Sequence, residues 1–506
     1  MSKKVIVIGS GFAGLSAATH LANKGFDVTI LEKNSVAGGR ARQFSVANFP
    51  PSGELGGDTE GSFVFDMGPS WYWMPEVFEE YFARFGKKRS DYYQLVRLDP
   101  SYTVTFSDGD VLRLPAKMDE LEALFERYET GSAVKLRRFL AEAEYKYRVG
   151  MGEFVQKPSH SIWEFADRRV VRSLFQLQMF TNISSHIRRL FKNEKLIQLL
   201  EFPVLFLGAT PQRTPALYSL MNYADMSLGT WYPMGGMFEI VKAMVALAEE
   251  LGVKILLNQE VKQIVSSGHR AVKVMTATDE FAADIVVGGA DYHHLDQEVL
   301  TPKNRNYTEG YWQSRTMAPS SLLFYLGVNQ RVRNLEHHNL FFDADFNQHA
   351  QDIYEKPKWT ENPLFYVCAP SKTDPSVAPE GCENLFILIP TAPNLTDDTE
   401  GLREHFYDVV MDRLEKHIGQ PIREHVVFKR SYAHSDFKKD YHAFKGNAYG
   451  LANTLRQTAF LKPKMKSKRL DNLWFTGQLT TPGPGVPPSL ISGQVVAEDI
   501  LKNYKP

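Results

Sequence analysis

The sequence predicts an α/β protein in which a doubly wound parallel sheet is interrupted by a mixed α+β domain. Residues 3–34 read as strand, glycine-rich turn, helix and second strand, which is the order of a nucleotide-binding βαβ unit. Residues 471–500 read as an apolar strand, a stiff loop and a helix. The chain has 506 residues, too many for one hydrophobic core, because single cores stop growing near about 250–300 residues.

The first strand and turn carry a dinucleotide motif. Residues 5–8 are continuously apolar, as in a buried parallel strand. Gly9, Gly11 and Gly14 form a GxGxxG pattern, in which the glycines permit a tight turn, the approach of a pyrophosphate and close helix packing. The helix N-terminus offers N–H groups to phosphates. Glu32 ends the second strand 23 residues after Gly9, near the distance of about 20 expected for an acid that binds a ribose hydroxyl.

The residues after the second strand favour FAD over NAD. Gly38, Gly39 and Arg40 form a glycine pair followed by a cation, which resembles the second motif of FAD enzymes of the glutathione-reductase and amine-oxidase type. Such a motif supplies backbone N–H groups and a positive charge beside a diphosphate. We therefore expect a Rossmann-type, FAD-binding domain.

Two middle segments are expected to add strands to this domain. Residues 251–265 read as strand, turn and strand, and residues 283–295 as a buried strand that ends in small residues. In FAD enzymes of the glutathione-reductase and amine-oxidase type, the segment that residues 251–265 resemble places its backbone beside the adenine of FAD, which here would be the backbone near Val261. Both segments are equally consistent with core strands that touch no ligand.

The C-terminal loop is expected to lie against a flat, redox-active ring. Residues 479–493 contain four prolines and three glycines, and a helix is predicted to begin near Pro487 and Pro488, since proline suits a first helical turn. A flavin that has accepted a hydride carries negative charge along one edge, and a helix N-terminus would stabilise that charge by about 0.3–2 kcal/mol. We expect the ring to lie against Gly485, Val486 and Pro487.

The chain resembles the bacterial phytoene desaturase family, the FAD-dependent carotenoid desaturases, over nearly its whole length. The segments that carry the resemblance are "VIGSGFAGLSAA", "LEKNSVAGGRA", "FDMGPSWYWMP", "GTWYPMGGM", "APSKTDPSVAPEGC", "FKGNAYGLANTLRQTAFLKPK" and "TGQLTTPGPGVPPSLISG". Many relatives have alanine or an acid where this chain has Gln478, which can still bond a ribityl hydroxyl or a phosphate. The resemblance extends the expected cofactor-binding residues to Phe12, Ala13, Lys33, Gly68, Pro69, Ser70, Gly477 and Gln478.

The resemblance also implies a division of the chain. Residues 1–75, 230–295 and 465–506 would form a discontinuous FAD-binding domain, and residues 76–229 and 296–464 a substrate- and membrane-facing domain. Trp71, Tyr72 and Trp73 would either line a substrate tunnel or form an aromatic core cluster. Whether Tyr232 approaches the ring stays open.

Composition limits the partners. The formal net charge of −1 gives no sign of nucleic-acid binding. Cys368 and Cys382 are expected to be reduced thiols. The N-terminal residues include only four apolar residues before a glycine, too few for a signal peptide core, and no stretch reaches the length of a membrane span. We expect a cytoplasmic protein that docks peripherally on a membrane.

A surface for that membrane contact is predicted in residues 171–207. Arg188, Lys192 and Lys195 would share one face of a helix there, with Ile187, Leu190 and Phe191 elsewhere on the turn. The alternative is an ordinary helix packed on the core.

The implied reaction is desaturation of a hydrophobic carotenoid, either phytoene-type or a hydroxylated carotenoid at its 3,4 bond. Flavin would accept a hydride, and oxygen or a quinone would reoxidise it. No strong acid–base pair stands out, because His434 and Asp436 read as loop residues, so the catalytic residues stay unassigned. No metal-binding spacing is present. Alternatives are a carotenoid isomerase that uses reduced flavin, an amine oxidase, whose usual flavin-linking cysteine is missing here, and a non-enzymatic carotenoid or lipid carrier.

Overall fold

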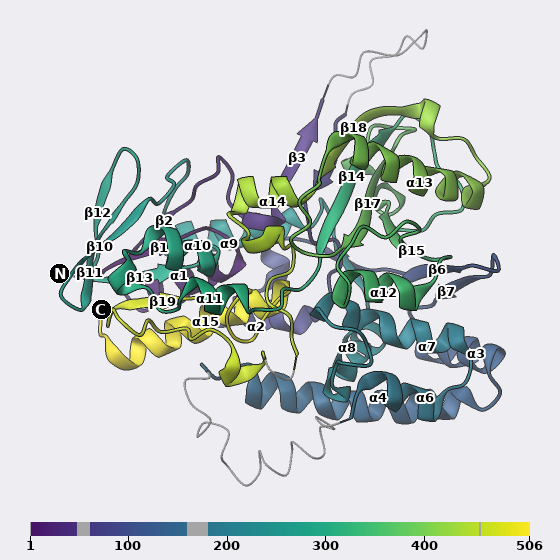
Figure 1. The fold of residues 1–506 in the computed structure, drawn as a ribbon, viewed down its shortest axis with the longest axis horizontal. Helices are drawn as coiled ribbons and strands as arrows, with labels where there is room; N and C mark the ends of the chain where they lie inside the picture. Colours follow the sequence, from purple (N-terminus) through teal and green to yellow (C-terminus); the bar gives the residue numbers. More distant parts are fainter. Residues whose placement is uncertain (1, 48–60, 159–180, 455–456) are drawn as a thin grey trace.

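The computed structural model describes residues 2–47, 61–158, 181–454 and 457–506. Two large β-sheets lie on opposite sides of the molecule (Figure 1). The chain termini lie close together beside the five-stranded sheet, and the seven-stranded sheet stands on the other side (Figure 1). The architecture is mixed α/β, as the sequence predicts.

The five-stranded sheet is parallel throughout and draws on segments far apart in the sequence. Its order is β19-β13-β1-β2-β9. The strands are β1 (Lys4–Ile8), β2 (Asp27–Leu31), β9 (Lys254–Leu256), β13 (Ile285–Gly288) and β19 (Leu473–Phe475). The strands expected at both ends of the chain and in its middle therefore meet in one sheet.

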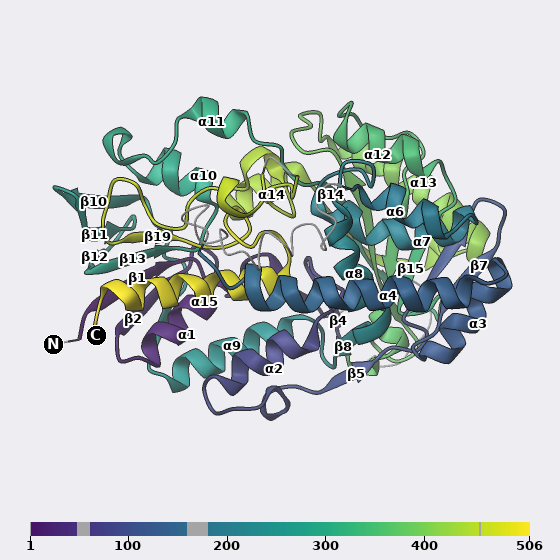
Figure 2. The same cartoon turned by 90° about the horizontal axis from the view of Figure 1, so that it is seen from below.

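Three helices cover this sheet, namely α1 (Phe12–Ala22), α9 (Phe238–Glu250) and α15 (Val486–Asn503). The helices α1 and α15 run side by side (Figure 2). A glycine allows this close packing, because a Cβ added at Gly493 of α15 would lie 2.2 Å from the carbonyl oxygen of Ala13 in α1. The first and last helices of the chain are thus held against one another.

The seven-stranded sheet has the order β18-β14-β17-β16-β15-β6-β7 and is antiparallel except where β15 pairs with β6. Its strands are β6 (Tyr102–Phe106), β7 (Val111–Leu114), β14 (Ser320–Val328), β15 (His338–Phe342), β16 (Phe365–Cys368), β17 (Glu383–Thr391) and β18 (Val426–Tyr432). Side chains alternate between its faces. On β14, Phe324 packs in the same core as α13 (Glu400–Ile418), whereas Leu323 and Tyr325 belong to the large central core on the other face.

Smaller elements complete the fold. There is one three-stranded sheet, of order β10-β11-β12, and there are two two-stranded sheets, β3-β4 and β5-β8, among the described residues. Their strands are β3 (Gln43–Val46), β4 (Phe63–Asp66), β5 (Leu95–Arg97), β8 (Trp231–Pro233), β10 (Gln263–Ser267), β11 (Arg270–Met275) and β12 (Glu280–Ala282). Further helices are α2 (Pro75–Ala83), α3 (Met118–Tyr128), α4 (Ser132–Val149), α6 (Ile183–Leu190), α7 (Glu194–Glu201), α8 (Leu220–Asn222), α10 (Tyr292–His294), α11 (Glu309–Gln313), α12 (Phe346–Tyr354) and α14 (His434–Tyr441).

The single basic helix face predicted within residues 171–207 is wrong. Residues 171–180 lie outside the described residues, and the rest forms two short helices, because α6 ends at Leu190 and Asn193 caps α7. Arg188 pairs with Glu194 at 2.7 Å, and Lys195 pairs with Asp108 at 2.6 Å. The apolar side chains Ile187 and Phe191 are fully buried. The segment therefore packs as part of the core, which was the alternative expectation. In the part of the chain that the structure describes, no helix is long and apolar enough to cross a membrane.

Candidate functional site

A cavity of about 1160 Å³ begins at the carboxyl ends of β1, β2, β13 and β19 and extends to the inner face of the seven-stranded sheet. Ligands of open parallel sheets bind at this edge. The volume exceeds the range of about 300–1,000 Å³ that is typical of a single-ligand pocket. The cavity is therefore larger than a typical single-ligand pocket.

The predicted cofactor-binding residues meet at this cavity. All except Gly14 line it, namely Gly9, Gly11, Phe12, Ala13, Glu32, Lys33, Gly38, Gly39, Arg40, Gly68, Pro69, Ser70, Val261, Gly477, Gln478, Gly485, Val486 and Pro487. Gly14 lies behind the wall, where it lets α1 approach the turn after β1. Their contacts with a cofactor stay a prediction.

The start of α1 fits a phosphate group. Gly11 caps this helix, and no heavy atom lies within 4 Å of the position that a Cβ would take there. Gly39 supports the same turn, since a Cβ on it would lie 3.3 Å from the Cα of Gly11. Open space beside the free N–H groups of a helix N-terminus is what a pyrophosphate requires.

Glu32 is more heavily bonded than the sequence suggests. Its Oε2 accepts hydrogen bonds from the backbone N–H and the hydroxyl of Ser10, at 2.9 and 2.6 Å, and its Oε1 accepts two bonds from Asn34, both at 2.9 Å. A carboxylate has about four acceptor positions, and all are used. The carboxylate thus ties the loops after β1 and β2 together, and a ribose hydroxyl would have to replace one of these bonds.

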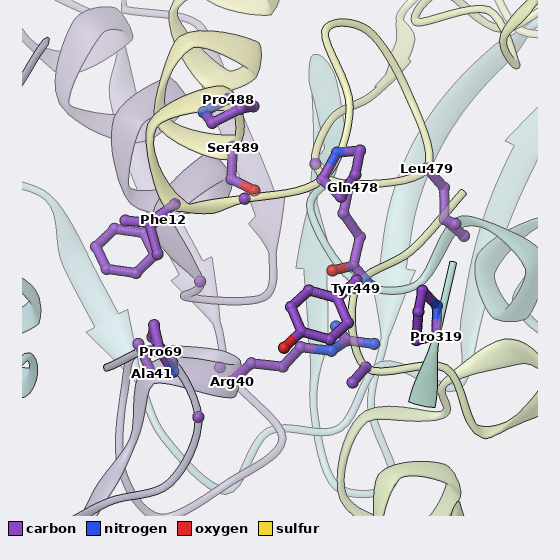
Figure 3. A pocket seen from close by; sticks show the side chains of 18 of the residues that line it. Phe12, Arg40, Ala41, Pro69, Pro319, Tyr449, Gln478, Leu479, Pro488 and Ser489 are labelled. Atoms are coloured by element: carbon purple, nitrogen blue, oxygen red, sulfur yellow. The ribbon is translucent and has the colours of Figure 1, made fainter. Parts of the chain in front are cut away.

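Arg40 is a buried cation without a full set of partners. Its Nη2 lies 3.5 Å from the carbonyl oxygen of Asn447, and 2.9 Å from the amide oxygen of Gln478 in the orientation of that amide that satisfies its neighbours. Its Nε has no partner. Burial lowers the pKa of the guanidinium, and the carboxylate of Asp291 partly offsets this. Figure 3 shows Arg40, Tyr449 and Gln478 gathered at this wall. A buried guanidinium with an unsatisfied N–H fits a phosphate of a dinucleotide.

The stiff loop ends as predicted at the first turn of α15. Gly485 has φ +113° and caps the helix, whose first residues are Val486, Pro487 and Pro488. The first turn faces the cavity, and Figure 3 shows Pro488 and Ser489 above Phe12. The helix N-terminus is therefore placed where it can stabilise negative charge on a bound group.

The far part of the cavity is apolar. Trp71, Trp73, Phe202, Leu323 and Phe342 belong to its wall. Trp71 and Trp73 thus line the cavity and also pack in the central core, and their role in a substrate tunnel stays a prediction.

Tyr72 and Tyr232, in contrast to the two tryptophans, lie away from the wall of the cavity. Tyr72 turns into the core, where its hydroxyl lies 2.8 Å from that of Tyr93. Tyr232 lies outside the large cavity and donates to Asp374 at 3.3 Å. Neither ring lines the large cavity.

His434 and Asp436 are not loop residues, because they begin α14. His434 is buried, with its Nε2 2.8 Å from the carbonyl oxygen of Ala392, and neither residue lines the large cavity. His349 does line the cavity, but its Nδ1 accepts from the N–H of Leu364 at 2.6 Å and its Nε2 lies 3.2 Å from the carbonyl oxygen of Pro390. Burial lowers its pKa to about 4. His349 is therefore a neutral, fully bonded ring and not a free base.

One group of potential metal ligands was not predicted from the sequence, because its residues do not have the spacing of a metal-binding motif. One nitrogen each of His337 and His338 and the sulfur of Cys368 lie within 4.8 Å of one another. Pairing of β15 with β16 sets His338 opposite Cys368, a proximity that linear spacing does not reveal. Cys368 and Cys382 are both free thiols and both are buried.

Comparisons with known proteins agree with this geometry. Residues 12–501 match the family described as flavin containing amine oxidoreductase. The chain is 41% identical to a carotenoid 3,4-desaturase of Haloarcula japonica, over 99% of this chain and 98% of that protein. It is 31% identical to a zeta-carotene-forming phytoene desaturase of Myxococcus xanthus, over 99% and 94% of the two chains.

Solved structures share the fold at low sequence identity. A cyclohexylamine oxidase from Brevibacterium oxydans superposes with a TM-score of 0.59 at 15% identity, covering 99% of both chains. An oxidoreductase from Methanosarcina mazei superposes with a TM-score of 0.60 at 15% identity, covering 98% of this chain and 100% of that one.

Proposed function

Because the chain belongs to the family of flavin-containing amine oxidoreductases, we propose that it is an FAD-dependent carotenoid desaturase. Its substrate is a phytoene-type carotenoid or a hydroxylated carotenoid that is oxidised at its 3,4 bond. Similarity to carotenoid desaturases along the whole chain supports this. The observation that supports it most directly is that one cavity connects the proposed dinucleotide-binding edge of the five-stranded sheet with an apolar chamber at the seven-stranded sheet.

FAD fits the cavity better than a mononucleotide does. The open position at Gly11, the unsatisfied Arg40 and the start of α15 all border the same cavity. We assign the pyrophosphate to the first two features and the ring to the third. When bound, the flavin supplies a hydride acceptor.

The chain's own contribution is to hold the polyene and to exclude water. Each methylene buried from water is worth about 0.8 kcal/mol, so an apolar wall that includes Trp71, Trp73 and Phe342 competes with a lipid bilayer for the substrate. The start of α15 offers about 0.3–2 kcal/mol to negative charge at the ring edge. Positioning and desolvation then carry most of the rate enhancement.

The allylic proton leaves without a dedicated strong base. His349 is neutral and has both ring nitrogens engaged, so water or a weak base receives the proton. The hydride and the proton together account for the new double bond. The two electrons pass on to oxygen or to a quinone.

We also propose the division of the chain that the sequence suggested. Strands of the five-stranded sheet fall within residues 1–75, 230–295 and 465–506, and those of the seven-stranded sheet within residues 76–229 and 296–464. This supports an FAD-binding domain and a substrate domain with the cavity between them. The water-insoluble substrate favours a peripheral membrane location on the cytoplasmic side.

Reconstitution tests this function. Purified protein is incubated with phytoene or with a hydroxylated carotene in liposomes, and the products are followed by absorbance and chromatography. A product that absorbs at longer wavelength supports desaturation. A change of geometric isomer without longer conjugation would indicate the isomerase, and bound carotenoid that stays unchanged would indicate the carrier.

A further inference from the structure

Three side chains that bind metals meet where β15 pairs with β16. His337 directly precedes β15, His338 begins it, and Cys368 ends β16. One nitrogen of each ring and the sulfur of the cysteine lie within 4.8 Å of one another. The three residues are buried, with exposed fractions of 4%, 0% and 4%. Two imidazoles and a thiol gathered in the interior are the ligand types of a zinc site.

Each imidazole keeps one nitrogen without a hydrogen-bond partner. Nδ1 of His337 lies 2.7 Å from the hydroxyl of Thr373, and Nδ1 of His338 lies 2.6 Å from the hydroxyl of Tyr366. Nε2 of both rings is buried and unbonded. Because a hydroxyl can donate or accept, either nitrogen of each ring can present its lone pair to a metal. A hydrogen bond at the other nitrogen is how metal-binding histidines are usually oriented.

Strand pairing and aromatic packing hold the three ligands in place. The register of β15 and β16 sets His338 opposite Cys368. The ring of His338 stacks on Trp71 at 4.3 Å between centroids, that of His337 packs against Tyr232 at 4.6 Å, and the two imidazoles lie 4.5 Å apart. Neighbouring ligands of a tetrahedral zinc lie about 3.3–3.8 Å apart, given bonds of about 2.0–2.3 Å. Side-chain rotations of an ångström or so therefore close the site.

A small cavity beside the cluster offers room for a fourth ligand. Its volume is about 20 Å³, and both His337 and Cys368 line it. One water molecule needs about 10–15 Å³. The carboxylic acid Asp66 also belongs to its wall, and none of the described wall residues is a lysine or an arginine. A cation bound here meets no positive side chain in that wall.

We propose that His337, His338 and Cys368 bind one zinc ion, with a water molecule in the small cavity as the fourth ligand. Two imidazole nitrogens and a thiolate suit zinc, whereas magnesium and calcium prefer oxygen ligands. On binding, the thiol of Cys368 releases its proton to solvent, and both histidines bind in their neutral form. The proposal goes beyond the proposed function and needs neither flavin nor carotenoid.

The ion would fasten the wall of the large cavity from behind. Trp71 and Tyr366 line that cavity, and both contact His338, the first by stacking and the second by its hydroxyl. A zinc ion that joins β15 to β16 at this point restrains these two rings. Because such an ion binds the folded chain and not the unfolded one, it should also raise the temperature of unfolding.

Zinc binding by the flavin-loaded full chain tests the site. The protein is first dialysed against a chelator, and binding of Zn²⁺ is then measured by equilibrium dialysis with metal analysis. The site variants are Cys368→Val and His337→Phe, and the matched control is Cys382→Val, which replaces the other buried thiol. Co²⁺ serves as a second probe, because a thiolate ligand gives it a charge-transfer band in the difference spectrum against the metal-free protein.

The wild type and Cys382→Val should bind about one zinc per chain, and zinc should raise their unfolding temperature. Both site variants should bind zinc about 100-fold more weakly or worse, since even changes to residues that orient metal ligands cost about 10- to 100-fold. Flavin content identifies a variant that fails to fold, and the other variant then decides. If both fail, the cobalt band of the wild type decides.

Three results would overturn the zinc site. One is a wild type that binds no stoichiometric zinc. Another is equal binding by the wild type and both site variants, which would assign the metal to exposed side chains elsewhere. The third is cobalt binding by the wild type without a thiolate band.

Discussion

Replacing Gly485 with valine should release the flavin. Gly485 has φ +113°, a conformation that costs a residue with a side chain about 1–3 kcal/mol. A Cβ at this position would lie 3.2 Å from Cδ of Pro488 and 3.4 Å from its Cγ. Because both atoms belong to a rigid ring in the first turn of α15, either the loop or the helix start must move.

The displacement acts on the wall that we assign to the flavin ring. If about 1.4 kcal/mol or more of the strain is relieved by moving the loop away from the ring, affinity falls tenfold or more. The matched control is Gly109→Val. Gly109 has φ +83° and no heavy atom within 4 Å of its Cβ position, and it lies between β6 and β7, away from the cavity. The Gly109→Val variant therefore introduces backbone strain without a clash against neighbouring atoms.

The assay compares visible flavin absorbance per mole of protein with thermal unfolding for both variants. Both should be destabilised, but only Gly485→Val should lose flavin through dialysis. Full flavin retention by Gly485→Val, at the level of Gly109→Val, would refute the assignment of the ring to residues 485–487.

Three further predictions concern other parts of the molecule. Arg40→Met should lower flavin affinity about tenfold or more, because it removes a cation that supplies charge-assisted hydrogen bonds to a phosphate; titration of the apoprotein with FAD measures this, and unchanged affinity would contradict the placement. Burial raises the pKa of Asp225 from 3.8 to about 7, so the folded state binds its proton more tightly and stability should fall from about pH 4 to pH 7, by at most about 1.4 kcal/mol per pH unit. Denaturant unfolding at several pH values should show that Asp225→Asn reduces this slope, and an unchanged slope would exclude the residue as its cause. Reversing the charges of Arg188, Lys192 and Lys195 should leave co-sedimentation with anionic liposomes unchanged, since Arg188 and Lys195 are paired with acids; a large loss would restore this surface as a membrane contact.

Local sequence signals predicted which residues meet at the carboxyl edge of the five-stranded sheet. The glycines after β1, the pair after β2 and the prolines at α15 each impose a backbone geometry that depends on a few neighbouring residues. Those residues consequently line one cavity, although they come from both ends of the chain. The sequence did not reveal that the carboxylate of Glu32 already accepts hydrogen bonds from Ser10 and Asn34. Those hydrogen bonds depend on how two loops meet in the fold.

Tertiary proximity set the limits elsewhere. The pattern between Arg188 and Lys195 read as one helical face, but an Asn193 cap divided it and acids from a distant hairpin neutralised Lys195. Side chains such as His338 and Cys368 carry no metal-binding motif, and their proximity becomes visible only in three dimensions. The register that sets them opposite one another belongs to two strands, so no local pattern gives a sign of it.

Anaerobic mixing of the purified protein with its carotenoid substrate is the most direct test. The account predicts a yellow protein whose oxidised-flavin absorbance bleaches as one new double bond forms per flavin, with colour restored when oxygen or a quinone is added. A protein that binds no flavin after reconstitution, or one whose flavin stays oxidised while the carotenoid is desaturated, would contradict it.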